Sequence, residues 1–113
     1  MPAFRRQYRY RFGDIDDADV LLVSVRRRTL PKEQLDYVRK HVAAGKPVIG
    51  IRTASHAFTL RRQVPPEGLS AWPEFDAQVF GGNYSNHHGN KLVATINVIE
   101  KSADHPIFEG IPQ

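Results

Sequence analysis

Polar side chains that could do chemistry follow a short apolar run near the middle of the chain. The run covers residues 47–52 and is rich in β-branched residues. Ser55 and His56 come just after it and carry a hydroxyl and an imidazole, the groups of a nucleophile and a general base. Arg52 could hold a carboxylate or phosphate through two hydrogen bonds. Serine also commonly caps the start of a helix, so capping is the alternative for Ser55.

Two further clusters could supply ligand-binding groups. Arg26 opens an arginine-rich turn, residues 26–28, after a second apolar run. Its alternative role is that of a solvated turn residue. His87 and His88 lie in the polar loop 83–90, and one of them could face a ligand. Adjacent side chains often point apart, so these two alone do not predict a metal site, and we expect no metal and no cofactor.

The elements that would position these groups form one strand–helix–strand unit. Residues 19–25 and 47–52 read as parallel strands that are apolar on both faces, which is typical of strands covered on both sides. Between them, apolar residues recur at helical spacing after Pro31, and Gly45 predicts a left-handed helix end. Parallel strands end at the same edge of a sheet, and ligands bind in the crevice there. The sequence therefore predicts a site after residues 25 and 52.

The remaining segments predict smaller elements. Residues 4–12 alternate aromatic and basic side chains, as an edge strand does, and residues 13–19 read as an acidic turn. Short helices are expected within 54–60 and 70–80, the second packing through Trp72 and Phe75. Residues 92–99 alternate well enough to predict another strand.

Composition restricts the class of protein. The chain has 113 residues, so we expect a single domain over 1–113. It carries a net charge of +4 and no cysteine, which excludes disulfides and a thiolate nucleophile within it. No recognition motif accompanies the basic charge, so nucleic-acid binding is not the favoured interpretation. No apolar run approaches the length of a membrane span, and we expect a soluble, cytoplasmic protein.

Several motifs together resemble the trehalose-utilisation, or ThuA-like, family, from about Asp17 to the end. They are residues 17–23 (DADVLLV), 26–30 (RRRTL), 43–58 (AAGKPVIGIRTASHAF), 80–84 (FGGNY), 87–89 (HHG) and 104–107 (DHPI). The resemblance implies the fold of class I glutamine amidotransferases, a flavodoxin-like three-layer α/β sandwich with a mainly parallel sheet. Because ThuA-like domains are longer, it also implies a partial domain, incomplete at both ends. Sheet edges left uncovered would then favour a partner or a homo-oligomer.

The resemblance also bears on chemistry. In those amidotransferases the central strand is followed by Gly-x-Cys-x-Gly-x-Gln, and residues 50–56 occupy that stretch here. Arg52 stands at the position of the cysteine and Ala54 at that of the second glycine, which argues against glutamine hydrolysis. The family name implies a role in sugar utilisation. We therefore expect a small polar or sugar-like ligand bound by Arg26, Arg52, His87 or His88, with Ser55 and His56 as candidates for catalysis. The alternative is a non-catalytic interaction module that kept the fold.

Overall fold

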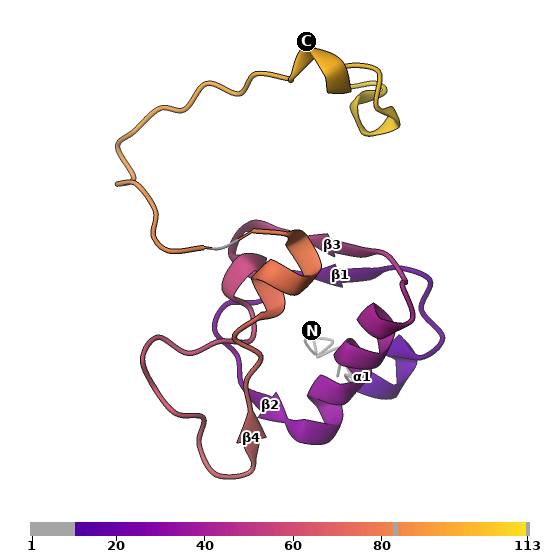
Figure 1. The fold of residues 1–113 in the computed structure, drawn as a ribbon, viewed down its shortest axis with the longest axis vertical. Helices are drawn as coiled ribbons and strands as arrows, with labels where there is room; N and C mark the ends of the chain where they lie inside the picture. Colours follow the sequence, from indigo (N-terminus) through magenta and orange to yellow (C-terminus); the bar gives the residue numbers. More distant parts are fainter. Residues whose placement is uncertain (1–10, 83, 113) are drawn as a thin grey trace, which may run out of the picture.

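The computed structural model describes residues 11–82 and 84–112 (Figure 1). Its strands are β1 (Leu21–Val23), β2 (Leu30–Pro31), β3 (Val48–Gly50) and β4 (Leu69–Ser70). The one α-helix among the described residues is α1 (Lys32–Ala43). Short helical turns complete the order: η1 (Phe12–Ile15), η2 (Arg52–His56), the π-helical η3 (Asp76–Phe80), η4 (Glu100–Ser102) and η5 (Pro106–Phe108).

The strands β1 and β3 form the predicted parallel pair. Leu21 lies opposite Val48, and Val23 lies opposite Gly50. The Ile51 N–H donates to the Val23 carbonyl at 2.9 Å, which extends the ladder to the point where both strands end. The chain is thus a mixed α/β protein with a parallel strand pair, connected through α1.

The sequence places α1 and its end correctly. Leu35 and Val38 are buried on its inner side, as the helical spacing predicts. Gly45 has φ of 70°, and its N–H donates to the Val42 carbonyl at 2.9 Å, while the Lys46 N–H donates to the His41 carbonyl at 3.3 Å. These two bonds satisfy carbonyls that a helix end leaves unpaired, and the left-handed residue between them favours glycine.

An aromatic cluster forms the centre of the core. Phe75 is 1% exposed and meets the rings of Phe58, Trp72 and Phe80 edge to face, at centroid distances of 4.9, 5.1 and 5.4 Å. The guanidinium of Arg39 on α1 lies 4.6 Å from the Trp72 ring centroid, which ties the helix to this cluster. Trp72 and Phe75 therefore pack in the core as predicted. The helix predicted within 70–80 is shorter than that range, because η3 begins only at Asp76.

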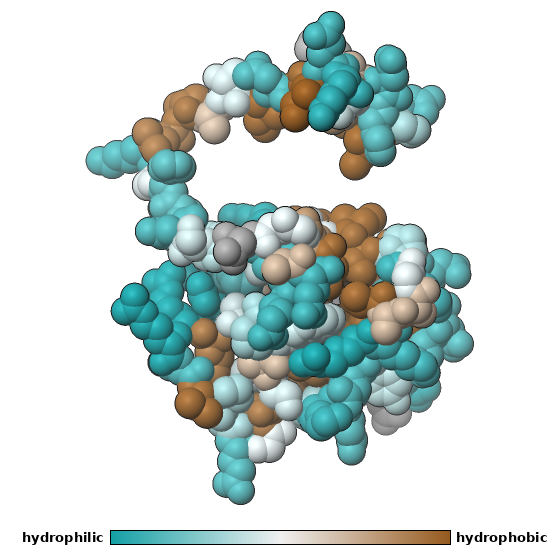
Figure 2. Space-filling view, in the orientation of Figure 1, coloured by the Kyte–Doolittle hydropathy of each residue, from teal (hydrophilic) through white to brown (hydrophobic). Residues whose placement is uncertain are grey.

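The expectation that the parallel strands are apolar and buried on both faces is wrong. Val23 is buried against the core, but Leu22 is 57% exposed and Ile49 is 52% exposed. Side chains alternate across a strand, and in the described part of the chain the core packs on only one face of the pair. Figure 2 shows hydrophobic surface over this end of the body.

The strand predicted over residues 92–99 is not formed. The segment is extended without ladder hydrogen bonds, and Val93 and Ile96 are 97% and 92% exposed. A strand exists only by pairing, and residues 85–112 run away from the body instead (Figure 1). The predicted edge strand 4–12 lies almost wholly outside the described residues, and its last residue, Phe12, begins η1.

One strand pair was not predicted. Strands β2 and β4 are antiparallel, with Leu30 opposite Ser70 and Pro31 opposite Leu69. A strand of two residues is too short to show the alternation of apolar and polar residues from which a strand is predicted.

Among the described residues, no helix combines the length and apolar character needed to cross a bilayer.

Candidate functional site

The turns that follow β1 and β3 are hydrogen-bonded to each other. The Arg27 N–H donates to the His56 carbonyl at 3.1 Å, and the Arg28 N–H donates to the Ala57 carbonyl at 2.6 Å. The Thr53 hydroxyl donates to the Val25 carbonyl at 3.1 Å. The polar residues after the two strands therefore meet at one edge of the pair, as the parallel arrangement predicts.

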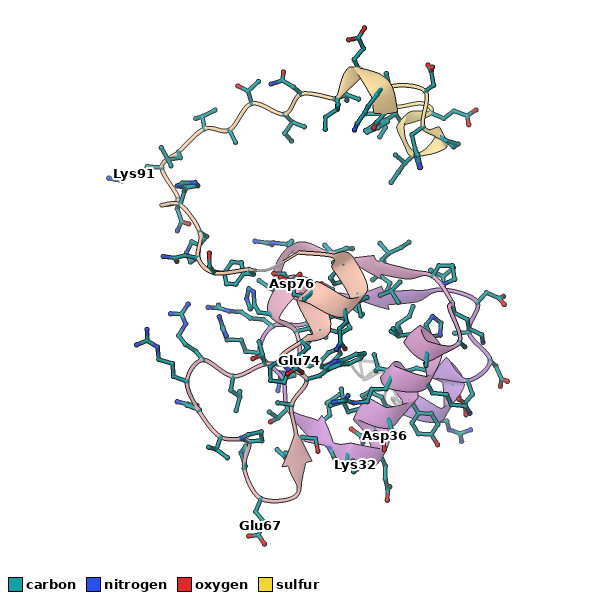
Figure 3. The ribbon with its side chains drawn as sticks, viewed as in Figure 1. Lys32, Asp36, Glu67, Glu74, Asp76 and Lys91 are labelled. Atoms are coloured by element: carbon teal, nitrogen blue, oxygen red, sulfur yellow. The ribbon has the colours of Figure 1, made fainter. Side chains whose placement is uncertain are left out.

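A cavity of about 710 Å³ opens beside these joined turns. Its walls come from the turn after β1, from η2 and the loop that follows, and from η3 with the polar loop after it. Glu74 and Asp76, on its η3 side, are labelled in Figure 3. The other polar or charged lining residues are Arg27, Ser55, His56, Thr59, Arg61, Arg62, Tyr84, Ser85 and Asn86.

Ser55 and His56 both border the cavity and contact each other. The Ser55 Oγ lies 3.2 Å from the His56 Nδ1, so the hydroxyl can donate to the neutral imidazole. Helix capping does not account for Ser55, because η2 begins after Ile51 and has no side-chain cap. Thr53 does not cap either, since its hydroxyl bonds to the turn after β1. The serine is thus free to act on a ligand.

Burial and neighbouring arginines keep His56 neutral. Its side chain is 8% exposed and its ring lies 4.5 Å from the Tyr84 ring, centroid to centroid. Burial lowers its pKa below the usual 6.5, and the positive charges of Arg27, Arg26 and Arg61 lower the pKa further. The Asp76 carboxylate acts in the opposite direction but more weakly. A neutral imidazole can accept a proton, which is what a general base requires.

This lowered pKa makes stability depend on pH. Between the folded-state pKa of His56 and the unfolded value of about 6.5, the unfolded chain binds a proton that the folded chain does not. We expect the His56 contribution to be fully present above about pH 7 and to fall progressively as the pH drops below 6.5. Urea unfolding across this range should show a shallower pH dependence for His56→Gln than for the wild type. If the free energy of unfolding varied with pH in the same way in both proteins, His56 would not be the source of the pH dependence.

Asp76 fixes the polar loop against the cavity. Its carboxylate is buried, and Oδ2 accepts the Tyr84 N–H at 2.6 Å. A Cβ at Gly82 would lie 3.1 Å from Oδ1, so the chain passes close to the carboxylate only because glycine stands there. Asp76 therefore places Tyr84 beside His56, which closes one side of the cavity.

The backbone of Arg52 adopts a left-handed conformation, which is unfavourable for a residue that has a side chain. Its φ is 54°, in the left-handed region, directly after β3. A sharp turn of this kind at a strand end is where many α/β enzymes hold a nucleophile, but a guanidinium cannot serve as one. Arg52 borders a smaller cavity of about 200 Å³ together with Ser55 and Asp76.

The strain at Arg52 predicts an unusual stabilising substitution. Arg52→Gly should raise the free energy of unfolding by about 0.5–1 kcal/mol, because relief of the left-handed penalty exceeds the added entropy of the unfolded chain. Arg28→Gly, at an exposed arginine with an ordinary φ, should instead lower it by a similar amount. Urea denaturation of both variants measures the two changes in the free energy of unfolding. If both changes had the same sign, the backbone of Arg52 would not be strained.

The other predicted ligand-binding residues lie around the large cavity rather than in its wall. Arg26 is exposed and acts on His56 through its charge. His87 is exposed, and its Nδ1 lies 2.9 Å from the Tyr84 hydroxyl. His88 is exposed in the same loop.

Four wall residues escaped the sequence interpretation: Arg61, Arg62, Asp76 and Tyr84. The two arginines occur in a segment read only as loop, and Asp76 lies on a helix read for its apolar side. An acid five residues before a Gly-Gly pair is too common a spacing to single out. Only the path of the chain brings these residues to η2.

Neither metal coordination nor sequence similarity adds to this picture. Among residues 11–82 and 84–112, no three histidine, aspartate or glutamate side chains gather in a way that could hold a metal ion. Comparisons with models of protein families, with curated proteins and with solved structures find no match.

Proposed function

We propose that this chain is a ThuA-like domain that binds a small polar, sugar-like ligand in the 710 Å³ cavity at the carboxyl ends of β1 and β3. The observation that carries the proposal is the pair of hydrogen-bonded turns beside this cavity. In open α/β sheets such a crevice is the usual ligand site. On this proposal, the parallel pair is part of a flavodoxin-like sandwich.

The cavity wall suits a ligand that carries several hydroxyl groups. Ser55 and Thr59 offer hydroxyls that both donate and accept, and Asn86 offers an amide that does the same. The Tyr84 ring gives an apolar face against which a sugar ring can pack. Ser55 and His56 form the pair that could act on the bound molecule, with His56 neutral and able to take a proton.

Glutamine hydrolysis is not part of the proposed function. Class I amidotransferases need a cysteine thiolate at the strand-end turn, and Arg52 occupies that turn here with the chain held in the left-handed region. Incubation with L-glutamine should release no ammonia above the buffer rate. Steady ammonia release that is abolished by Ser55→Ala would overturn this part of the proposal.

A thermal-shift screen tests the binding proposal. Neutral sugars, keto-sugars and sugar phosphates are added in increasing concentration, and a true ligand should raise the Tm progressively. Asn86→Ala should weaken the response, because Asn86 lines the cavity, whereas Asn97→Ala, in the extended segment, should not. A screen without any concentration-dependent shift would contradict sugar binding.

The second candidate is a non-catalytic interaction module. The observation that favours it is Arg52, since the position best suited to a nucleophile holds a residue that cannot be one. This candidate predicts that the wild type does not turn over the ligand found in the screen, so that Ser55→Ala and His56→Ala remove no activity. Turnover lost in both variants would instead favour an enzyme.

A further inference from the structure

Three arginines in the cavity wall form no ion pair with any residue that the structure describes. Arg27, Arg61 and Arg62 all line the cavity. The two ion pairs formed among the described residues, Lys32–Asp36 and Lys40–Asp16, involve neither these arginines nor the cavity. Arginine side chains that line a cavity can bind a carboxylate or phosphate through paired hydrogen bonds.

The positive charge outweighs the acids that share the wall. Glu74 and Asp76 are the acidic lining residues, and Asp76 already accepts the Tyr84 N–H. The charges of Arg27, Arg26 and Arg61 lower the pKa of the His56 imidazole, and the Asp76 carboxylate raises that pKa less. An anion entering the cavity therefore meets a positive potential on the side of the arginines.

We propose that the ligand of this cavity is a phosphorylated sugar, with its phosphoryl group held by Arg27 and Arg61 and with Arg62 adding positive charge to the wall. The inference rests on the proposed sugar-binding function and names the class of sugar. A wall with a surplus of positive charge suits a phosphoryl group better than a single carboxylate, because a phosphoryl group offers three acceptor oxygens and close to two negative charges at neutral pH. The sugar ring would then extend along Ser55, Asn86 and the Tyr84 ring.

Two of the three arginines adopt a sparsely populated backbone conformation. Arg27 and Arg62 have φ of 48° and 53°, in the left-handed region. Such conformations persist only where the surrounding structure enforces them, and they gather at ligand sites. For Arg27 the enforcing contact is the hydrogen bond from its own N–H to the His56 carbonyl.

Calorimetric titration of the wild-type chain tests the ligand class directly. Glucose 6-phosphate, glucuronate, glucose and inorganic phosphate are compared under one buffer. Glucose 6-phosphate is expected to bind roughly tenfold or more tighter than glucuronate or glucose, and inorganic phosphate should compete with it. Added potassium chloride should weaken the binding, because salt screens the arginines.

The outcomes separate this inference from the proposed function. Equal affinities for glucose and glucose 6-phosphate would overturn the phosphate site and leave sugar binding intact. Equal affinities for glucuronate and glucose 6-phosphate would show that a single carboxylate suffices, which also overturns it. Binding of inorganic phosphate without any sugar preference would support the arginine site and contradict the sugar. No response to any of the four compounds would overturn both.

A matched pair of variants assigns the binding to these arginines. The double variant Arg27→Gln/Arg61→Gln should raise the Kd for glucose 6-phosphate by roughly a hundredfold, since two charged hydrogen-bonding groups are lost. Arg28→Gln removes a charge from the same turn but lies outside the cavity wall, and it should change the Kd less than about threefold. Thermal unfolding without ligand checks that each variant is folded. Equal losses in the two variants would overturn the assignment.

Discussion

Phe75→Ala is expected to lower the free energy of unfolding by about 3–5 kcal/mol, the largest stability effect in the chain. Phe75 is 1% exposed and lies between three aromatic rings, so truncation removes the buried ring and leaves a cavity that the edge-to-face neighbours cannot fill by small shifts. Urea denaturation followed by Trp72 fluorescence measures the change, because the indole is part of the same cluster.

The control for Phe75 is an apolar residue in open solvent. Val93 is 97% exposed in the extended segment, and Val93→Ala should change the free energy of unfolding by less than about 0.5 kcal/mol. Phe75→Leu should fall between the two, since it keeps part of the buried volume. A loss below about 1 kcal/mol for Phe75→Ala would mean that the aromatic cluster is not the core.

Gly50→Ala is expected to destabilise the fold by about 1–3 kcal/mol. Gly50 ends β3, and the Phe80 ring packs directly over it: an added Cβ would lie 2.9 Å from the Phe80 Cε1 and closer still to Cζ. The ring cannot swing away freely, because it also packs against Phe75. Either the ring or η3 must move, and η3 carries Asp76, so ligand binding should weaken as well.

Gly13→Ala is the matched control for this substitution. A Cβ at Gly13 would meet its nearest neighbour, the Tyr37 hydroxyl, at 3.8 Å, which is an ordinary contact. We expect this variant to be neutral or more stable by up to about 1 kcal/mol, because alanine reduces the entropy of the unfolded chain. Urea midpoints of the two variants that agree within error would contradict the close approach of Phe80 to β3.

These effects show how the site is supported. The aromatic cluster holds η3 against the end of β3, and η3 places Asp76, which positions Tyr84 beside His56. Arg27 in the cavity wall is held through the hydrogen bond from its N–H to the His56 carbonyl. Substitutions in the core should therefore disturb ligand binding, whereas substitutions of cavity arginines should leave stability nearly unchanged.

The sequence by itself determined the unit formed by β1, α1 and β3. The apolar spacing of Leu35 and Val38, together with the glycine after the helix, specifies α1, because helix periodicity and a left-handed end are properties of neighbouring residues. The apolar runs around 21–23 and 48–50, separated by that helix, predict a parallel pair, since a helical crossover of this length returns the chain in the same direction. Because the two strands are parallel, the turns that follow them lie at the same edge, and this brings Arg27 to His56.

Only the tertiary structure decided which surfaces are covered and which distant residues complete the cavity. The same apolar alternation that buries Val23 leaves Leu22 exposed, and the pattern of 92–99 forms no strand, because burial and pairing depend on a second element that local sequence does not specify. Asp76 and Tyr84 join His56 through the packing of η3 on β3. Contacts between residues so far apart in the chain depend on the summed packing of the core, which no short pattern encodes.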